Sequence, residues 1–296
     1  MIKNFFDKEN INYEENASLK KYNTYKVDTK CLYLVFPKSI EELIKIIRYL
    51  KKNKIAYLVL GNGSNIIFSK DYYDKVVIKL DNLNNVEYQD NIVTAEAGYS
   101  LSKLALETTN KGLDGLTFAA GIPGCVGAST AMNAGAYNSD MSKVVKTVKV
   151  LNENLDIITL NNEDLQYEYR DSFLKKHPEY IVLEATFELF YNDPEMMKGL
   201  INERRKKRIA TQPLELPNAG SVFRNPENMY AGELIEKSNL KGFTIGGAKV
   251  SEKHANFIVN SGNAKGKDIV KLIKKIKEEV KKNYNVELKL EQIIID

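Results

Sequence analysis

The sequence predicts a protein that mixes helices and strands in three consecutive regions. A strand, a helix and a second strand follow one another within residues 1–80, which is typical of a β-α-β unit. Residues 81–208 are rich in predicted strands, and residues 209–296 combine a loop, helices and strands. A chain of 296 residues can bury substantial cores without metal or disulfide support.

The first region is predicted from its caps and its apolar runs. Tyr33–Phe36 reads as a strand, and Ser39 with Glu42 forms a capping-box pattern that begins a helix ending near Lys52. Ile55–Leu60 is a second strand, and it leads directly into the turn Gly-Asn-Gly-Ser-Asn at 61–65.

The second region holds most of the predicted strands. A helix is expected over Leu101–Asn110, where apolar residues recur at helical spacing. Val144–Val150 and Ile157–Leu160 form a predicted hairpin. Other strands of this region are predicted at Ile92–Ala97 and Tyr180–Leu189, and Val76–Leu80 is a further predicted strand at the end of the first region.

The third region follows a helix that begins at Asp193-Pro194 and carries the basic run Arg204–Arg208. Asp268–Asn283 is a predicted amphipathic helix with Ile269, Leu272, Ile273, Ile276 and Val280 on one face. The other predicted elements are a helix near Ala231–Ser238, a strand at Phe257–Val259 and a terminal strand over Val286–Ile295.

Composition restricts the class of protein. The 43 basic and 39 acidic residues give a net charge of +4, a mild excess that suits small anionic ligands better than nucleic acid. Two cysteines, Cys31 and Cys125, exclude a disulfide framework but leave a single bridge open, and they fit a reducing compartment. No run approaches the roughly 20 apolar residues of a membrane span, so we expect a cytoplasmic protein without membrane contact. His177 and His254 lack partners at ligand spacing, so no metal site is expected.

Two glycine-dense segments are candidates for binding a phosphate-bearing ligand. Residues 61–65 can present consecutive backbone amides to an anion, although the turn lacks the lysine of a P-loop and could be a structural turn. Residues 112–137 have glycine every few positions and a single charged residue, Asp114. Two such segments can bind the pyrophosphate of a dinucleotide from both sides, because glycine lets the backbone approach the phosphate oxygens closely.

Six motifs occur together in one order. They are Gly61-Asn-Gly-Ser-Asn65, Gly121-Ile-Pro-Gly124 with Gly127, Asn133-Ala-Gly-Ala-Tyr137, Tyr169-Arg170-Asp-Ser172, Gly220-Ser-Val-Phe223 with Asn225-Pro226, and His254 to Asn260. In this order and spacing the chain, from about Asn23 to its end, resembles the UDP-N-acetylenolpyruvoylglucosamine reductases, and specifically a shorter subtype without a tyrosine-bearing loop.

The resemblance implies an α+β fold. Its FAD-binding part has two subdomains of the vanillyl-alcohol-oxidase-like type, expected at 1–80 and 81–208, and a substrate-binding domain follows at 209–296. It further implies a monomeric oxidoreductase of peptidoglycan synthesis that binds FAD tightly. NADPH would reduce the flavin and leave before the UDP-sugar takes its place. The FAD-binding residues implied are Gly61, Asn62, Gly63, Ser64, Asn65, Gly121, Ile122, Pro123, Gly124, Gly127, Asn133, Ala134 and Gly135.

The resemblance also assigns catalytic roles to Arg170, Ser221 and Glu291. Hydride addition to an enolpyruvyl ether places negative charge on the neighbouring carboxylate, which Arg170 and a protonated Glu291 would stabilise. Ser221 would supply the proton. From the residues alone, the simpler interpretations are a surface arginine, a turn serine and a solvated strand edge.

Five further residues are expected at the substrate: Tyr169, Arg208, Arg224, Asn225 and His254. Thr211 stands where many relatives have a lysine, so one phosphate contact is in doubt and Arg208 or Arg224 could replace it. Two rival hypotheses are kept, namely another FAD-linked oxidoreductase of this fold and a non-enzymatic basic module that binds nucleotides through Arg204–Arg208.

Overall fold

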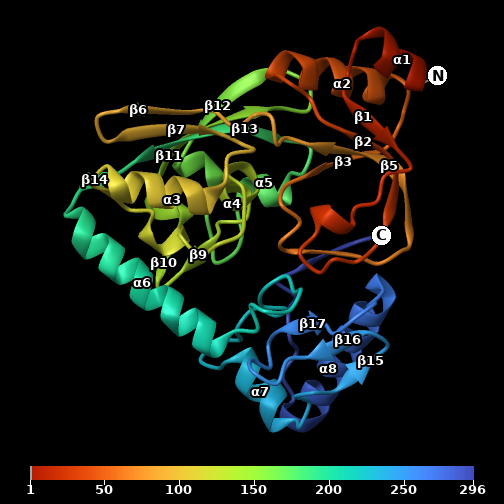
Figure 1. The fold of residues 1–296 in the computed structure, drawn as a ribbon, viewed down its shortest axis with the longest axis vertical. Helices are drawn as coiled ribbons and strands as arrows, with labels where there is room; N and C mark the ends of the chain where they lie inside the picture. The colour runs from red at the N-terminus through yellow and green to blue at the C-terminus, as the bar shows by residue number, and fades with distance from the viewer. Residues whose placement is uncertain (1) are drawn as a thin grey trace. The chain divides into compact units, whose positions relative to one another are not determined.

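A computed structural model describes residues 2–296, which divide into two compact units. Unit 1 consists of the chain up to Glu15 together with Tyr33–Gly61 and Lys75–Arg205. Unit 2 consists of Asn16–Leu32, Asn62–Asp74 and Lys206–Asp296. Both units combine helices with sheets (Figure 1), which confirms the α+β class.

The N-terminal part of unit 1 builds a four-stranded sheet in the order β1-β2-β5-β3. Its strands are β1 (Tyr13–Glu15), β2 (Lys30–Val35), β5 (Tyr72–Lys79) and β3 (Tyr57–Leu60), of which β2 and β5 begin within unit 2, and helices α1 (Ile2–Lys8) and α2 (Ile40–Lys52) belong to the same part. The predicted cap is confirmed, because Ser39 Oγ accepts from Glu42 N at 3.2 Å. The predicted neighbours β2 and β3 are separated by β5, which pairs with β3 in parallel.

The rest of unit 1 is built on a five-stranded antiparallel sheet in the order β12-β11-β13-β7-β6. Its strands are β12 (Ile157–Asn161), β11 (Val145–Leu151), β13 (Ile181–Glu188), β7 (Ile92–Glu96) and β6 (Val86–Gln89). The predicted hairpin is β11 with β12, so that expectation is confirmed. Helix α3 (Leu101–Asn110) has the predicted bounds, and α4 (Val126–Ala131), inside the glycine-dense segment, packs on β13.

Short elements complete unit 1. They are β8 (Leu113–Asp114), β9 (Gly135–Ala136), β10 (Ser139–Asp140), β14 (Phe190–Tyr191) and α5 (Phe173–Lys176). Helix α6 (Pro194–Thr211) continues from unit 1 into unit 2. The Asp193 carboxylate accepts from the amides of Glu195 and Met196 at 2.7 and 2.9 Å, which satisfies the first turn of α6.

Unit 2 packs helices against a three-stranded antiparallel sheet, β15-β16-β17. Its elements are α7 (Ala231–Lys237), β15 (Thr244–Ile245), β16 (Ala248–Val250), β17 (Ile258–Asn260), α8 (Gly266–Tyr284), and the parallel pair β4 (Ile66–Phe68) and β18 (Ile293–Ile295). The predicted apolar face of α8 is buried throughout, and Tyr25, Val27 and Ile67 from the early stretches of unit 2 join the same core.

The predicted terminal strand over Val286–Ile295 is wrong in its extent, because only Ile293–Ile295 is a strand. Residues before it run beside 222–224 instead. Arg224 N donates to Lys289 O and Glu291 N to Val222 O, each at 2.9 Å, and Phe223 pairs with Leu290 in an isolated bridge. The alternation of apolar and polar residues therefore predicted an extended backbone here, but not that residues 222–224 would be its partner.

Candidate active site

The first glycine turn, residues 61–65, lies at the start of the stretch Asn62–Asp74 of unit 2. It contacts residues 22–24 of the same unit. Gly63 has a φ of +63°, and a Cβ placed there would lie 2.2 Å from Tyr22 O. Thr24 N donates to Gly63 O at 3.1 Å. Both the backbone conformation and the close approach require glycine at this position.

Gly61, at the start of that turn, packs against the second glycine-dense segment within unit 1. A Cβ on Gly61 would lie 3.0 Å from Cys125 Sγ and 2.9 Å from Ala128 Cβ. Lys79 Nζ donates to Gly61 O at 2.6 Å, and the lysine is only 2% exposed. Sequence reasoning missed Lys79, although a lysine at the end of an apolar strand is a usable signal of a buried charge.

The second segment is closely packed by backbone contacts. Leu101 N donates to Gly124 O at 3.0 Å, Val126 N to Tyr99 O at 2.8 Å and Gly127 N to Ala97 O at 2.9 Å. The backbone amides of Val126 and Gly127, inside the segment, therefore already donate to carbonyls of the protein. The hydroxyl of Thr130 in α4 is buried without a hydrogen-bond partner, so a polar group remains to be satisfied here. Small side chains and this hydroxyl fit a large planar cofactor.

Arg170 lies at the tip of a tight turn in unit 1, with a φ of +55°. Glu168 and Asp171 exchange backbone hydrogen bonds across the turn at 3.0 and 3.2 Å. The guanidinium donates to the carbonyl of Asn133 at 3.5 Å and to that of Gly135. Its carbon lies 5.0 Å from the centre of the half-exposed Tyr169 ring, a cation–π contact. The predicted residues Tyr169 and Arg170 thus lie together with the segment 133–135.

Ser221 and Glu291 come together in unit 2, although 70 positions separate them. Glu291 N donates to Val222 O at 2.9 Å, so the two residues lie on adjacent backbone segments. Gln292 fixes the same junction, because its side-chain amide donates to Ala219 O and Gly220 O at 3.0 and 3.2 Å. Both Ser221 and Glu291 are half-buried. Arg170 belongs to the other unit, and its meeting with these two residues stays a prediction.

The other residues expected at the substrate belong to unit 2 and have identified contacts. Arg208 Nε donates to Gln212 Oε1 at 3.1 Å, and Asn225 Oδ1 accepts from the first amide of α7 at 3.1 Å. Arg224 carries its backbone bond to the terminal segment. Burial lowers the pKa of the His254 imidazole, whose Nδ1 accepts from Asn256 N at 3.2 Å. This histidine is therefore held neutral at physiological pH.

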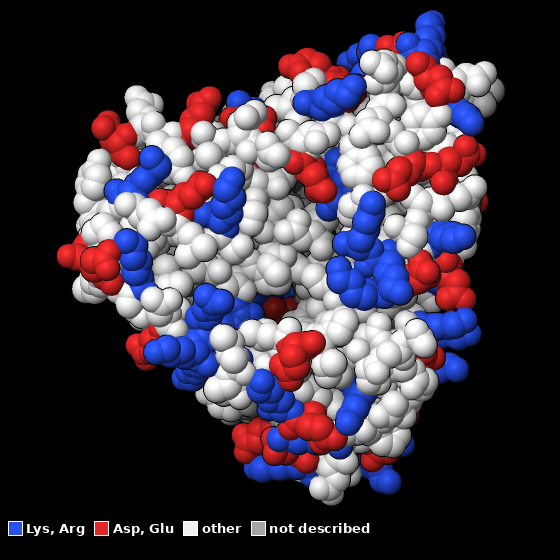
Figure 2. Space-filling model, viewed as in Figure 1, with Lys and Arg blue, Asp and Glu red and all other residues white. Residues whose placement is uncertain are grey.

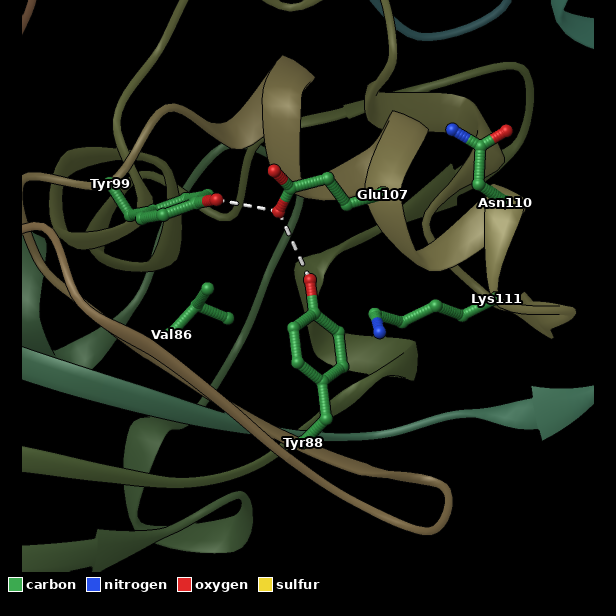
Figure 3. A pocket seen from close by; sticks show the side chains of 6 residues that line it. All are labelled: Val86, Tyr88, Tyr99, Glu107, Asn110 and Lys111. Atoms are coloured by element: carbon green, nitrogen blue, oxygen red, sulfur yellow. Dashed lines mark hydrogen bonds between the residues drawn. The ribbon is translucent and has the colours of Figure 1, made fainter.

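A shallow pocket of about 420 Å³ between α3 and β6 contains none of the expected site residues. Glu107 accepts from the Tyr99 hydroxyl at 2.5 Å and from the Tyr88 hydroxyl at 3.1 Å, and Figure 3 marks both hydrogen bonds. Burial, followed by these hydrogen bonds, raises the pKa of both tyrosines. Glu107 therefore links helix α3 to Tyr88 of β6 and to Tyr99.

The surface carries no single dominant sign on the face shown in Figure 2, where basic and acidic side chains are interspersed. Within the basic run, Arg204 belongs to unit 1, and its side chain already contacts other residues of that unit. Its guanidinium stacks 4.5 Å from the Tyr137 ring centre and donates to Thr117. Among residues 2–296 no cluster of histidine, cysteine, aspartate and glutamate could hold a metal ion. None of the helices described combines the length and apolar character needed to cross a bilayer.

Two family models match the chain. Residues 212–295 match the C-terminal domain of UDP-N-acetylenolpyruvoylglucosamine reductase, and residues 31–161 match an FAD binding domain. A UDP-N-acetylenolpyruvoylglucosamine reductase from Caldanaerobacter subterraneus is 44% identical over 92% of this chain and 90% of its own length. One from Clostridium novyi is 42% identical over 99% of this chain and 95% of its own.

Solved structures agree with the sequence matches. The UDP-N-acetylenolpyruvylglucosamine reductase of Thermus caldophilus superposes with a TM-score of 0.81 at 30% identity, over 97% of this chain and 99% of that one. A BBE-like protein of Physcomitrella patens superposes with a TM-score of 0.50 at 16% identity over 64% of this chain and 44% of that one, which supports the shared fold alone.

Proposed function

Because the chain belongs to the UDP-N-acetylenolpyruvoylglucosamine reductase family, we propose that it reduces UDP-N-acetylglucosamine enolpyruvate to UDP-N-acetylmuramate with electrons from NADPH. The chain is an FAD-dependent oxidoreductase of peptidoglycan precursor synthesis. The proposal adds the electron donor, the reaction sequence and the roles of individual side chains.

When bound, FAD supplies the hydride that the enolpyruvyl carbon receives. The residues that would hold it are those of the turn 61–65 and those of the segment 121–135 other than Asn133, whose side-chain amide is used inside the protein. Gly61 packs directly on Cys125 and Ala128, and glycine at 63 permits the tight turn. Lys79 donates to the first carbonyl of the turn and also lies 3.0 Å from Asp81 Oδ1, so it brings to the turn a positive charge that Asp81 partly balances and that would complement a diphosphate.

Arg170 and Glu291 are assigned to the carboxylate of the substrate. Negative charge develops there as the vinyl carbon is reduced, and a guanidinium can donate two parallel hydrogen bonds to such a group. Glu291, in its protonated form, would donate a further one. The carbonyls of Asn133 and Gly135 hold the guanidinium without neutralising its charge.

Ser221 is assigned as the donor of the proton to the carbon that bears the ether oxygen. The observation that carries the proposal is the bond from Glu291 N to Val222 O, which holds the donor hydroxyl and the assisting carboxyl on neighbouring segments of one unit. A serine is a weak acid, so the alkoxide that it leaves would require a nearby positive charge or a proton relay.

The UDP portion is assigned to the remaining residues of unit 2 and to Tyr169. Arg208 and Arg224 can bind phosphate oxygens, Asn225 and the neutral His254 can contact the sugar or base, and Tyr169 can stack on it. Since Thr211 already donates to Lys207 O at 2.8 Å, it caps the end of α6 and contributes no charge.

Separate measurement of the two half-reactions tests these roles. In Ser221→Ala, anaerobic NADPH should bleach the flavin absorbance near 450 nm at the wild-type rate, whereas reoxidation by the UDP-sugar should slow by about 100-fold or more. Equal loss of both half-reactions would remove Ser221 from the proton-transfer role. Flavin that an alcohol or hydroxy acid reduces, that oxygen reoxidises and that the UDP-sugar does not reoxidise would instead support an oxidase of the same fold.

A further inference from the structure

The turn that presents Arg170 has an unfavourable backbone conformation. A residue with a side chain costs about 1–3 kcal/mol at positive φ, and such positions persist only where the surroundings enforce them. Arg170 has a φ of +55°, and the hydrogen bonds between Glu168 and Asp171 close the turn from within. Something outside the turn must fix its position in the unit.

That support comes from the side chain of Asn133, in the segment expected at the flavin. Asn133 is 2% exposed. Its Nδ2 donates to Glu168 O at 2.8 Å, and its Oδ1 accepts from Ser142 N at 3.0 Å. Both ends of the amide are therefore used inside the protein. An asparagine also tolerates its own φ of +46°.

Further bonds join the same two segments. The guanidinium of Arg170 donates to the carbonyls of Asn133 and Gly135. Ser172 Oγ donates to Ala131 O at 2.6 Å. Within the turn's own segment, Lys175 Nζ donates to Arg170 O at 2.8 Å. Residues on both sides of the turn tip, and the guanidinium itself, are thus hydrogen-bonded to residues 131–135.

We propose that Asn133 is a positioning residue, whose side-chain amide fixes the turn of Arg170 to the flavin-binding segment rather than contacting the cofactor. This inference rests on the proposed role of Arg170. A displacement of about 1 Å in a group that stabilises a transition state can cost about 100-fold in rate. Cofactor binding and flavin reduction do not use the guanidinium in this mechanism, so only the second half-reaction depends on the amide.

The test uses Asn133→Gly in the full-length protein with bound FAD, since glycine keeps the positive φ and removes the amide. We expect FAD affinity and NADPH-driven bleaching within about twofold of wild type, and reoxidation by the UDP-sugar slowed about 10- to 100-fold. Asn162→Ala is the matched control. Its side-chain amide likewise bonds to backbone groups, donating to the carbonyls of Ser142 and Val145, but it lies outside the Arg170 turn. Reoxidation in this control should equal wild type.

A double-mutant comparison separates positioning from general damage. In an Arg170→Ala background, adding Asn133→Gly should slow reoxidation no further, because the group it positions is gone. Independent, multiplicative losses would overturn the inference. If Arg170→Ala alone reoxidises at the wild-type rate, the proposed function of Arg170 fails. If Arg170→Ala is slow and Asn133→Gly is not, only the positioning role fails.

A second variant covers the case in which Asn133→Gly does not fold. Asn133→Asp keeps an acceptor for Ser142 N and a shape close to asparagine, but it cannot donate to Glu168 O. It should show the same selective slowing of reoxidation with a thermal midpoint near that of Asn162→Ala. Normal reoxidation in Asn133→Asp would contradict the inference.

Discussion

The turn at 61–65 and the segment at 121–127 look alike in sequence and use glycine for different reasons. Gly63 has a positive φ and faces backbone atoms of residues 22–23. The glycines of the second segment have ordinary φ values, and Gly124 faces the side chain of Ser129, with a Cβ position 2.4 Å from its hydroxyl. The first turn requires glycine for its conformation, whereas the second requires it for space.

This difference means that the two segments should respond differently to the same substitution. A clash with backbone cannot be relieved by changing a neighbour, and positive φ adds strain whatever the space. A clash with a side chain can be relieved by shortening that side chain. Glycine density alone therefore predicts close packing without predicting its cause.

The largest effect is expected for Gly63→Ala. Strain and the contact with Tyr22 O should lower the free energy of unfolding by about 3 kcal/mol or more and abolish FAD binding, measured by chemical denaturation and flavin fluorescence. Gly199→Ala in α6 is the control, because a Cβ there meets nothing within 4 Å. That variant should be neutral or up to about 1 kcal/mol more stable. A Gly63→Ala protein as stable as this control would show that the turn does not need glycine.

A smaller and reversible effect is expected for Gly124→Ala. Its Cβ meets the Ser129 hydroxyl, which should cost about 1–3 kcal/mol of unfolding free energy. Adding Ser129→Ala should recover most of the loss, and chemical denaturation of the four proteins in this cycle measures the recovery. Strictly additive losses would mean that the second segment is limited by its backbone, like the first.

The smallest effect is expected for Lys79→Met, which addresses charge rather than space. Removing the donor to Gly61 O should weaken FAD binding by about tenfold, a change of about 1.4 kcal/mol. Titration of the apoprotein with FAD and with riboflavin measures it, and riboflavin, which lacks the diphosphate, should lose little. Lys149→Met, which removes a lysine paired with Glu184 on the five-stranded sheet, is the control. An equal loss for riboflavin would indicate that Lys79 only shapes the turn.

Much of the fold could be predicted because local signals agree with burial. Helix α3 has the predicted bounds, and α8 buries all five residues of its predicted face. The Ser39 cap was equally local. The terminal segment could not be predicted, since its partner is a stretch about 65 residues earlier, and alternation of apolar residues does not reveal which backbone a segment pairs with.

The candidate site residues were predicted through motifs, whereas Lys79 and the proposed positioning role of Asn133 were not predicted. Ser221 and Glu291 do lie on adjacent segments, as their expected roles require. The role of Lys79 was not predicted because its partner is the backbone carbonyl of Gly61, and the sequence gives no information about backbone carbonyls as partners. The tie between Asn133 and the Arg170 turn was hidden for the same reason, because it joins a side chain to a backbone carbonyl 35 positions away.

Unit 2 is assembled from three separated stretches of chain, and this has a consequence for synthesis on the ribosome. Residues 16–32 and 62–74 emerge early, yet Tyr25, Val27 and β4 find their partners only after the last 91 residues, 206–296, are made. During translation these apolar side chains stay exposed until residues 206–296 complete the core, and exposed apolar surface favours aggregation or chaperone binding. A separately expressed C-terminal fragment would lack them permanently, so it should be less soluble than the whole chain.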